Sequence, residues 1–559
     1  DFPNIIINDD NAYFRGYVAA RAYSSSAFKI SVNGNTEKII NIQPLSTGNR
    51  YEYAKGVVAE FNFTPSSDQL ILNTKYNRSS STSVGYLDYF EINVQRDLIF
   101  SNDQMIFRKA IENAEIAEYK LNNINQNTII WDVTTPVNPY KVNANIQGSG
   151  LTFKSDAVNL HEYIAFNGNS YLQTEFVEKV ENQNLHGYRN IDYLIISYPE
   201  FLDEAERLAE FHRTKGDLEV LVTTVGQVYN EFSSGGQDIT AIRDFAKMLY
   251  DDSDSGRELR YLLLFGDASY DYKDILSDNT NFVPCWESVK SLDGVSSIAS
   301  DDYFGFLDDG EGSEYSNDLV DIGIGRFVVG TIEEAQSAVD KTIHYTVKTS
   351  KVMAPWRNMV TFLADDGDGN RHLKDAERLA EIFDADHKVY NLNKIYTDAY
   401  EQISTPSGQA APDVNKAINE RIEKGTLIFN YSGHGGEIGF GEERFLQISD
   451  INSWQNYDKL AVFITATCEF TRYDDPTRVS AGELVFLNDN GGAISLYTTS
   501  RATFSGSNLA LNMAIYNDYM FMKIDGEYPR FGDIIRRSKL YGTANDKKFV
   551  LIASEKAID

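Results

Sequence analysis

The chain has 559 residues, with 82 acidic and 51 basic side chains and a net charge of −31 at pH 7. So negative a protein is repelled by the phosphate backbone of nucleic acids, and no nucleic-acid partner is expected. A hydrophobic content of 42% with 13% aromatic residues is typical of a folded protein, and this length predicts two to four domains. No apolar run approaches the ~20 residues of a transmembrane helix. The chain starts at Asp1 without a visible signal peptide, as expected of a processed or excerpted chain.

Residues 1–185 have the pattern of an all-β region. Short runs at 28–32, 57–63 and 70–72 alternate between apolar and polar side chains, or nearly so, and turn-forming residues lie between them. This spacing predicts a β-sandwich or jelly roll. The region shows no cluster of catalytic residue types, and we expect it to support or bind rather than catalyse.

From about residue 190 the pattern changes to alternating strands and helices, which predicts a doubly wound parallel sheet. A first α/β unit, 186–350, has strand-like runs at 193–198, 218–222, 261–265 and 320–326 and ends with a long helix at 333–350. A second unit, 351–559, begins with a strand at 359–364 and a helix at 373–383. We therefore expect two parallel-sheet subdomains after the β region.

Three strand-like runs of the second unit end in reactive side chains: Asp365, His434 and Cys468. Function gathers at the carboxyl ends of parallel strands, so these residues are expected at one edge of the sheet. A cysteine thiolate is a nucleophile, a histidine takes its proton, and an acid orients the imidazole. The backbone amides of Gly435 and Cys468 are the expected oxyanion donors.

Each of these residues also has a simpler interpretation. A lone cysteine after an apolar strand is usually a small core residue, and a lone histidine in a loop usually lies on the surface. Here glycines flank the histidine, and glycine lets the backbone approach a ligand closely. The flanking glycines and the shared sheet edge favour catalysis.

The segments at 430–435 (Asn-Tyr-Ser-Gly-His-Gly) and 466–470 (Ala-Thr-Cys-Glu-Phe) resemble the gingipain family of caspase-like cysteine peptidases. Further similar segments lie at 229–233, 237–243, 264–267, 324–326 and 491–494, so the resemblance covers about 190–552. It implies a caspase-like α/β peptidase with Cys468 as nucleophile and His434 as base. The third, acidic member falls nearest Asp365, next to Asp366, and no cofactor is required.

Segments 86–93 and 182–187 resemble one branch of this family, the PorU-type signal peptidases, or sortases, of the type IX secretion system of Bacteroidetes. This resemblance implies cleavage of C-terminal sorting domains from exported proteins and attachment of the products to surface polysaccharide. It also implies a position on the extracellular face of the outer membrane, with the barrel protein PorV as partner. Arginine-specific gingipains carry an acidic specificity residue where this chain aligns His372, so a trypsin-like preference is not expected.

Two acidic stretches are candidate calcium sites. Residues 366–377 half-match a calcium-binding loop, but Arg371 stands where the loop needs glycine, so we do not expect an EF-hand. Structural calcium is an open expectation at 300–302 and 308–309. Cys285 lies between Pro284 and Trp286 and is expected to be structural. The family usually continues after the last strand with Leu-Gly-Asp-Pro, whereas this chain continues with Ala-Ser-Glu at 553–555, as expected of a truncated or rejoined end.

Three functions stay open at this point. The first is a surface peptidase and transpeptidase of secretion, and the second is a secreted gingipain-like endopeptidase. The third is a catalytically silent scaffold whose β region binds a partner. Intact His434, Gly435 and Cys468 disfavour the scaffold. The long β region favours the first function over the second, because digestive gingipains carry a removable pro-segment instead.

Overall fold

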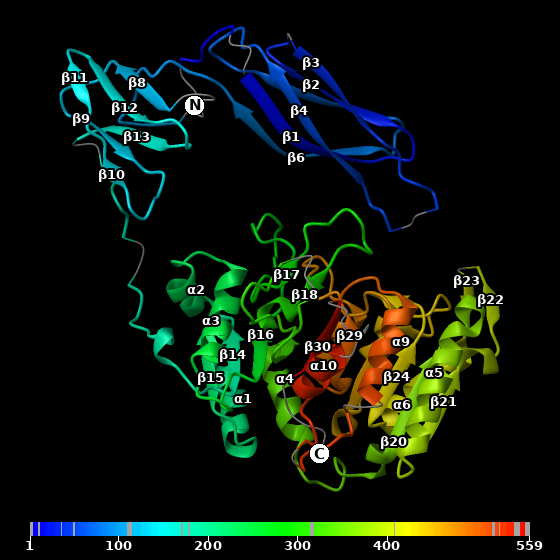
Figure 1. The fold of residues 1–559 in the computed structure, drawn as a ribbon. Coiled ribbons are helices and arrows are strands. Elements are labelled where there is room, and N and C mark those ends of the chain that lie inside the picture. The colour runs from blue at the N-terminus through cyan, green and yellow to red at the C-terminus, as the bar shows by residue number, and fades with distance from the viewer. Residues whose placement is uncertain are drawn as a thin grey trace. The chain divides into compact units, whose positions relative to one another are not determined.

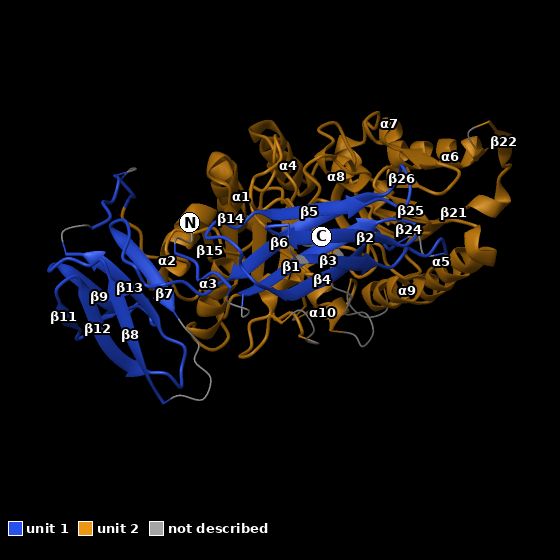
Figure 2. Cartoon of the chain, turned by 90° about the horizontal axis from the view of Figure 1, so that it is seen from above, with its two compact units in different colours: residues 1–181 blue, residues 182–559 orange. Residues whose placement is uncertain are grey.

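The computed structural model describes residues 4–8, 12–34, 36–48, 51–108, 115–168, 171–176, 179–313, 318–406, 408–516, 520–524, 526–540 and 548–553. The chain forms two compact units, residues 1–181 and 182–559 (Figure 2). The first unit ends four residues before the predicted boundary at 185. The residues after Ala553, where a truncated end was expected, lie outside the described part. Within the described part, no helix has the length and apolar character needed to cross a membrane.

The first unit consists of small antiparallel sheets (Figure 1). Its strands are β1 (Ala12–Arg21), β2 (Ser26–Val32), β3 (Thr36–Ile42), β4 (Lys55–Phe63), β5 (Leu72–Asn77), β6 (Val84–Asn93), β7 (Gln104–Arg108), β8 (Ile116–Asn122), β9 (Thr128–Asp132), β10 (Tyr140–Lys141), β11 (Asn145–Gln147), β12 (Gly150–Asp156) and β13 (Glu162–Asn167). Sheets β4-β1-β6 and β3-β2-β5 enclose one apolar core, and sheets β10-β9-β13-β7 and β11-β12-β8 enclose another. The predicted all-β region is therefore confirmed, as two small sandwiches in sequence.

The second unit is built on one ten-stranded sheet in the order β15-β14-β16-β19-β30-β29-β28-β24-β20-β21. Its strands are β14 (Tyr193–Ser197), β15 (Val220–Thr224), β16 (Tyr261–Phe265), β19 (Gly323–Phe327), β20 (Met359–Ala364), β21 (Asn391–Tyr396), β24 (Ile428–Ser432), β28 (Ala461–Ala466), β29 (Ala493–Thr499) and β30 (Phe549–Ile552). Short strands of two or three residues lie in the connections between these strands. They are β17 (Trp286–Glu287), β18 (Ala299–Ser300), β22 (Ile403–Thr405), β23 (Gly408–Ala410), β25 (Gly435–Gly436), β26 (Gly439–Phe440) and β27 (Leu446–Gln447). All neighbouring strands are parallel except β29 and β30.

Helices cover both faces of this sheet (Figures 1 and 2). They are α1 (Leu202–Lys215), α2 (Val225–Phe232), α3 (Ile239–Asp251), α4 (Ile332–Tyr345), α5 (Gly367–Asp386), α6 (Pro412–Lys424), α7 (Ile448–Ile451), α8 (Ala481–Leu487), α9 (Ser505–Ala514) and α10 (Phe531–Lys539). One core joins the sheet to α1, α4, α6 and α8. Two further cores on the opposite face join it to α2 and α3, and to α5, α9 and α10. Strands buried on both faces explain the nearly continuous apolar runs in the sequence.

The two predicted α/β subdomains share this single sheet. The predicted division at residue 350 falls between α4 and β20, and β30 joins the halves because it pairs with β19 on one side and β29 on the other. The doubly wound, caspase-like α/β class is confirmed. The two sheets expected for the subdomains are a single ten-stranded sheet. The pattern of apolar residues does not predict that β30 joins the two halves of the sheet, because β30 lies some 220 residues after its partner β19 in the chain.

Asp267 lies two residues after the end of β16 and is buried, and its Oδ1 makes no hydrogen bond to the described residues. Burial is the main cause that raises the pKa of Asp267, to about 8. An unfolded aspartate titrates near pH 4, so between pH 4 and 8 the folded state holds a proton that the unfolded state has released. The contribution of Asp267 to the free energy of unfolding is greatest below pH 4 and is lost as the pH rises to about 8.

We expect Asp267→Asn, which mimics the protonated acid, to reduce the fall in melting temperature between pH 5 and pH 8. Thermal unfolding of variant and wild type at both pH values checks this. The control is Asp278→Asn, because Asp278 is exposed and has a positive φ of 59° that asparagine tolerates. Equal pH slopes for wild type and Asp267→Asn would contradict the assignment.

Candidate active site

Strand register brings the predicted residues to one edge of the sheet. Ser432, the last residue of β24, pairs with Ala466, the last residue of β28, and also with Ala364, the last residue of β20. His434 and Cys468 therefore each lie two residues beyond a matched strand end. Asp365 lies one residue beyond the third strand end. This is the edge that the sequence predicted for all three.

The backbone of His434 is held on both sides. The carboxylate of Asp365, only 2% exposed, accepts a hydrogen bond from the His434 amide at 3.0 Å and another from the Gly367 amide at 2.9 Å. The His434 carbonyl accepts bonds from the Tyr431 hydroxyl and, at 2.8 Å, from the Gly441 amide. These bonds fix the position of the histidine in its loop independently of its ring.

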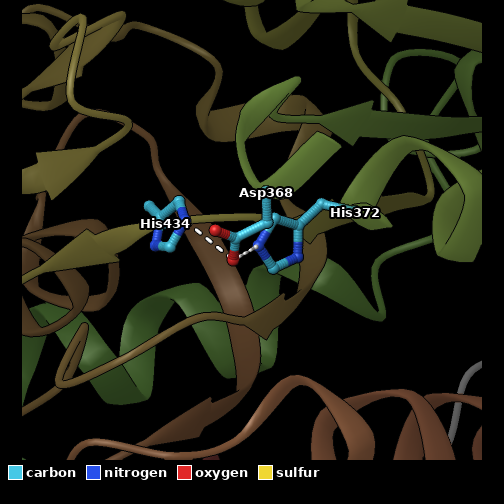
Figure 3. A group of neighbouring side chains, drawn as sticks. All are labelled: Asp368, His372 and His434. Atoms are coloured by element: carbon cyan, nitrogen blue, oxygen red, sulfur yellow. Dashed lines mark ion pairs between the residues drawn. The ribbon is translucent and has the colours of Figure 1, made fainter. Parts of the chain in front are cut away.

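The imidazole of His434 pairs with Asp368. Its Nε2 lies 3.3 Å from Asp368 Oδ2, and the same oxygen lies 3.6 Å from Nε2 of His372 (Figure 3). The expectation that Asp365 is the acid nearest the imidazole is wrong, because Asp365 binds the backbone amide and its oxygens make no ion pair with the ring. Asp365 remains a predicted site residue, now as the group that positions the histidine loop.

Asp368 was not predicted as a site residue, and His372 was noted only because it aligns with the specificity residue of arginine-specific gingipains. Residues 366–370 half-match a calcium-binding loop, and the helix was expected to begin at 373. In the structure α5 starts at Gly367, and Asp368, Gly369 and Asn370 have positive φ values of 53°, 66° and 62°. The available signal was the Asp-x-x-x-His spacing immediately after a strand tip, which puts both side chains near that tip.

His372 lies against His434. It is 7% exposed, and its ring meets that of His434 edge to face, with centroids 5.0 Å apart. Burial, and after it the neighbouring His434, lowers the pKa of His372. His372 is therefore neutral at pH 7, and adds no positive charge beside the base.

Cys468 is partly exposed, and its sulfur lies 3.5 Å from both the amide and the carbonyl oxygen of Thr503. Among the described residues no hydrogen bond joins the sulfur to the His434 ring. Catalytic hydrogen bonds are often long in free enzymes and tighten with substrate, so this geometry is compatible with a nucleophile and its base. The other cysteine, Cys285, is fully buried, and burial raises its thiol pKa, so it is inert as predicted.

The turn after β28 presents a backbone donor. Within the described part of the chain, the Cys468 amide makes no hydrogen bond, while the next residue, Glu469, has a positive φ of 51° and bonds through its amide to the Arg501 carbonyl. A non-glycine residue at positive φ is uncommon and indicates a turn held by its surroundings. The Cys468 amide therefore has no hydrogen bond to give up, and its role as an oxyanion donor stays a prediction. Gly435, the second expected donor, pairs with Phe440 in a short hairpin.

Arg501 supports this turn because its carbonyl accepts the hydrogen bond from the Glu469 amide. Its guanidinium binds the buried carboxylate of Asp474 and lies 3.2 Å from Glu287. Burial, and next the charge of Asp474, raises the pKa of Glu287 to about 9, so this carboxyl is protonated at neutral pH. Asp474 alone balances the charge of Arg501. Glu287 is thus a structural group here and no candidate for the catalytic acid.

Glu437 ties the histidine loop to the segment after Cys468. Its carboxylate binds Arg472 at 2.8 Å and also binds Arg478, and its carbonyl accepts from the Ala481 amide at 2.7 Å. We expect Glu437→Gln to lower the free energy of unfolding by about 1.5–3 kcal/mol, the usual range for hydrogen bonds to charged groups. Because both catalytic loops lose this link, kcat/KM is expected to fall as well.

Denaturant unfolding and peptidase assays check this expectation, with Glu442→Gln as the control. Glu442 belongs to the same loop but is exposed. A Glu437→Gln protein that matches the control in both stability and activity would contradict the role of this ion pair.

The acidic stretch at 300–302 binds protein cations. Asp301 makes two hydrogen bonds to the buried Arg326, at 2.7 and 2.8 Å, and Asp302 makes two to Lys539, both at 2.6 Å. These carboxylates are already neutralised by basic side chains. Structural calcium in this protein stays a prediction.

Comparison with known proteins identifies the family of the second unit. Residues 186–554 match the model of peptidase family C25. Gingipain R2 and gingipain R1 of Porphyromonas gingivalis are each 25% identical to this chain over 228 residues. The aligned part covers 41% of this chain but 26% of gingipain R2 and 19% of gingipain R1, so the chain spans a minor part of these relatives.

Two solved structures share the fold. Dimeric latent PorU from P. gingivalis aligns with all of this chain and 49% of its own, with a TM-score of 0.64 and 22% identity. The Arg-specific cysteine proteinase gingipain R (RgpB) aligns with 67% of this chain and 78% of its own, with a TM-score of 0.50 and 16% identity. With a family match that covers well over half of its length and a cysteine and a histidine at matched strand tips, the chain belongs to peptidase family C25, the gingipain family of cysteine peptidases.

Proposed function

We propose that this chain is a cell-surface peptidase and transpeptidase that removes C-terminal sorting domains from exported proteins. The observation that carries the proposal is the pair His434 and Cys468 at matched ends of β24 and β28, in a chain that resembles PorU over both of its units. The β unit favours this function over that of a digestive gingipain. The proposed location is the extracellular face of the outer membrane, with PorV as partner by family resemblance.

The first half of the proposed reaction forms a thioester. His434 takes the thiol proton, and the sulfur of Cys468 attacks the carbonyl carbon of the scissile peptide bond. The amides of Cys468 and Gly435 bind the oxygen of the tetrahedral intermediate. The C–N bond then breaks, and the imidazolium returns its proton to the leaving amine, which carries the sorting domain away.

Asp368 acts on the base in this scheme. Its carboxylate lies beside Nε2, so it stabilises the imidazolium that forms during attack and favours the tautomer with the proton on Nε2. Nδ1 is then the nitrogen that accepts the thiol proton. Among the described residues Nδ1 makes no hydrogen bond, so no contact has to break first. Asp365 contributes by holding the His434 backbone.

The second half of the reaction decides between two activities. Water attacking the thioester gives a free carboxyl end, and an amine gives a new amide bond; in both cases the thiol of Cys468 is restored. We propose that the acceptor is an amine of surface polysaccharide. Nothing in the groups around Cys468 distinguishes the two outcomes, because both pass through the same acyl-enzyme.

The test is a purified substrate that carries a C-terminal sorting domain, incubated with the enzyme and an added amine. Mass spectrometry of the new carboxyl terminus is expected to find the amine attached. A product with only free carboxyl ends, whichever surface-glycan amine is supplied, would leave a gingipain-like endopeptidase. No cleavage of any substrate would leave a binding scaffold. In cells, the expected result of Cys468→Ala is that exported proteins keep their sorting domains.

A further inference from the structure

We infer that Asp368, His372 and His434 form a binding site for a divalent transition metal ion of the zinc class, and that the bound ion switches the peptidase off. Each residue offers one ligand atom, and the three atoms lie within 4.8 Å of one another. Figure 3 shows the Asp368 carboxylate between the two imidazole rings. The aspartate and His372 come from the start of α5, and His434 comes from the loop after β24.

The spacing of the ligand atoms is close to that of a tetrahedral zinc site. Zinc–nitrogen distances of roughly 2.0–2.1 Å place neighbouring ligands of a tetrahedron about 3.3 Å apart. Oδ2 of Asp368 already lies 3.3 Å from Nε2 of His434 and 3.6 Å from Nε2 of His372. Only the two imidazoles must approach each other further.

Two of the three side chains have room to move into a metal-binding geometry, and the third has a buried nitrogen that a metal ion would satisfy. The Asp368 side chain is 58% exposed and that of His434 is 33% exposed, so both have room to move. His372 is buried, and its Nε2, which faces Asp368, makes no hydrogen bond to the described residues. A buried polar atom without a hydrogen bond is costly, and a metal ion would satisfy it.

The donor set selects the class of ion. Two imidazoles and one carboxylate suit zinc, cobalt and nickel, whereas calcium prefers six to eight oxygen ligands. Three protein ligands leave a fourth position for water. The site is therefore distinct from the structural calcium expected at the acidic stretches.

A bound metal ion would inhibit catalysis by occupying the imidazole of His434. This consequence rests on the proposed function. A metal ion bound to Nε2 takes up its lone pair, and the ring proton then resides on Nδ1. Nδ1 has no lone pair left to accept the thiol proton of Cys468, and Asp368 is no longer beside a proton. Removal of the ion restores both groups, so the inhibition is reversible.

Binding is tested first on the full chain with Cys468→Ala, so that no reactive thiol takes part. Zinc is titrated in competition with a chromophoric chelator, and cobalt(II) absorption reports the geometry. We expect one zinc ion per chain. When His372→Gln is introduced into the same Cys468→Ala protein, zinc is expected to bind at least 10-fold more weakly. Asp368→Asn, at an exposed side chain that does not threaten folding, is expected to weaken binding similarly. His387→Gln, at the other end of α5, is the control and should keep wild-type affinity.

Inhibition is tested on the protein with Cys468 intact, relative to the metal-free activity of each variant. Zinc is expected to inhibit the wild type, EDTA to restore activity, and His372→Gln to raise the inhibition constant by the factor seen in binding. Affinity unchanged in both His372→Gln and Asp368→Asn, affinity lost on replacing Cys468 alone, or stimulation by zinc would overturn the inference. Zinc binding with the expected variant pattern in a protein without peptidase activity would refute the proposed function and leave the metal site standing.

Discussion

Cys468→Ala is expected to abolish peptide-bond cleavage, with a loss in kcat of at least about 10³-fold, while the melting temperature stays near that of the wild type. In the proposed mechanism the Cys468 sulfur forms the acyl-enzyme, and no other described thiol can replace it, because Cys285 is fully buried. Removing the nucleophile of a hydrolase leaves only the contribution of binding and the oxyanion donors. The part-exposed position of Cys468 explains why the fold tolerates the change.

His434→Ala is expected to be about as damaging, and the double variant no worse than either single one, since nucleophile and base act as one unit. Cys285→Ala is the matched cysteine control and should keep its activity. The assay is cleavage of a peptide substrate by each purified variant, with circular dichroism to check the fold. Wild-type turnover by Cys468→Ala would contradict the thiol mechanism.

Gly433→Ala is expected to inactivate the enzyme and to lower its melting temperature. A Cβ at this position would lie 2.5 Å from the Cβ of Asp365 and still closer to the Tyr431 hydroxyl. These are the two side chains that hold the His434 backbone. The methyl group therefore pushes apart the contacts that place the base, and overpacking of this kind typically costs 1–3 kcal/mol.

Gly436→Ala provides the matched control in the same loop. A Cβ there meets nothing within 4 Å, so activity and melting temperature should stay near those of the wild type. The comparison separates crowding at Gly433 from any general need for glycine in the loop. If the two variants behave alike, the account of how His434 is positioned is wrong.

The edge that carries the site was predictable because its signals are local. Each of β20, β24 and β28 is a largely apolar and buried run, and a polar or reactive candidate residue follows its end within two residues. Parallel pairing of these strands aligns their ends without further information. The contact between Asp365 and the His434 amide follows from the same alignment.

Other features depended on contacts that no local pattern shows. β30 enters the middle of the sheet from the far end of the chain, so one sheet was predicted as two. Asp368 reaches the imidazole because three consecutive residues adopt left-handed backbone angles, which the sequence analysis did not anticipate. Asp365, the acid at the strand tip, stays a predicted site residue, and the acid beside the His434 ring, Asp368, lies three residues further on.

The most direct measurement of the central claim is to trap the acyl-enzyme. The enzyme is mixed with a peptide that spans the junction between an exported protein and its sorting domain, and the reaction is quenched in acid, where thioesters survive. Intact mass spectrometry is expected to find one added acyl group, and peptide mapping to place it on Cys468, with none in Cys468→Ala. Substrate turnover without any acyl adduct, or an adduct on another residue, would contradict catalysis through a Cys468 thioester.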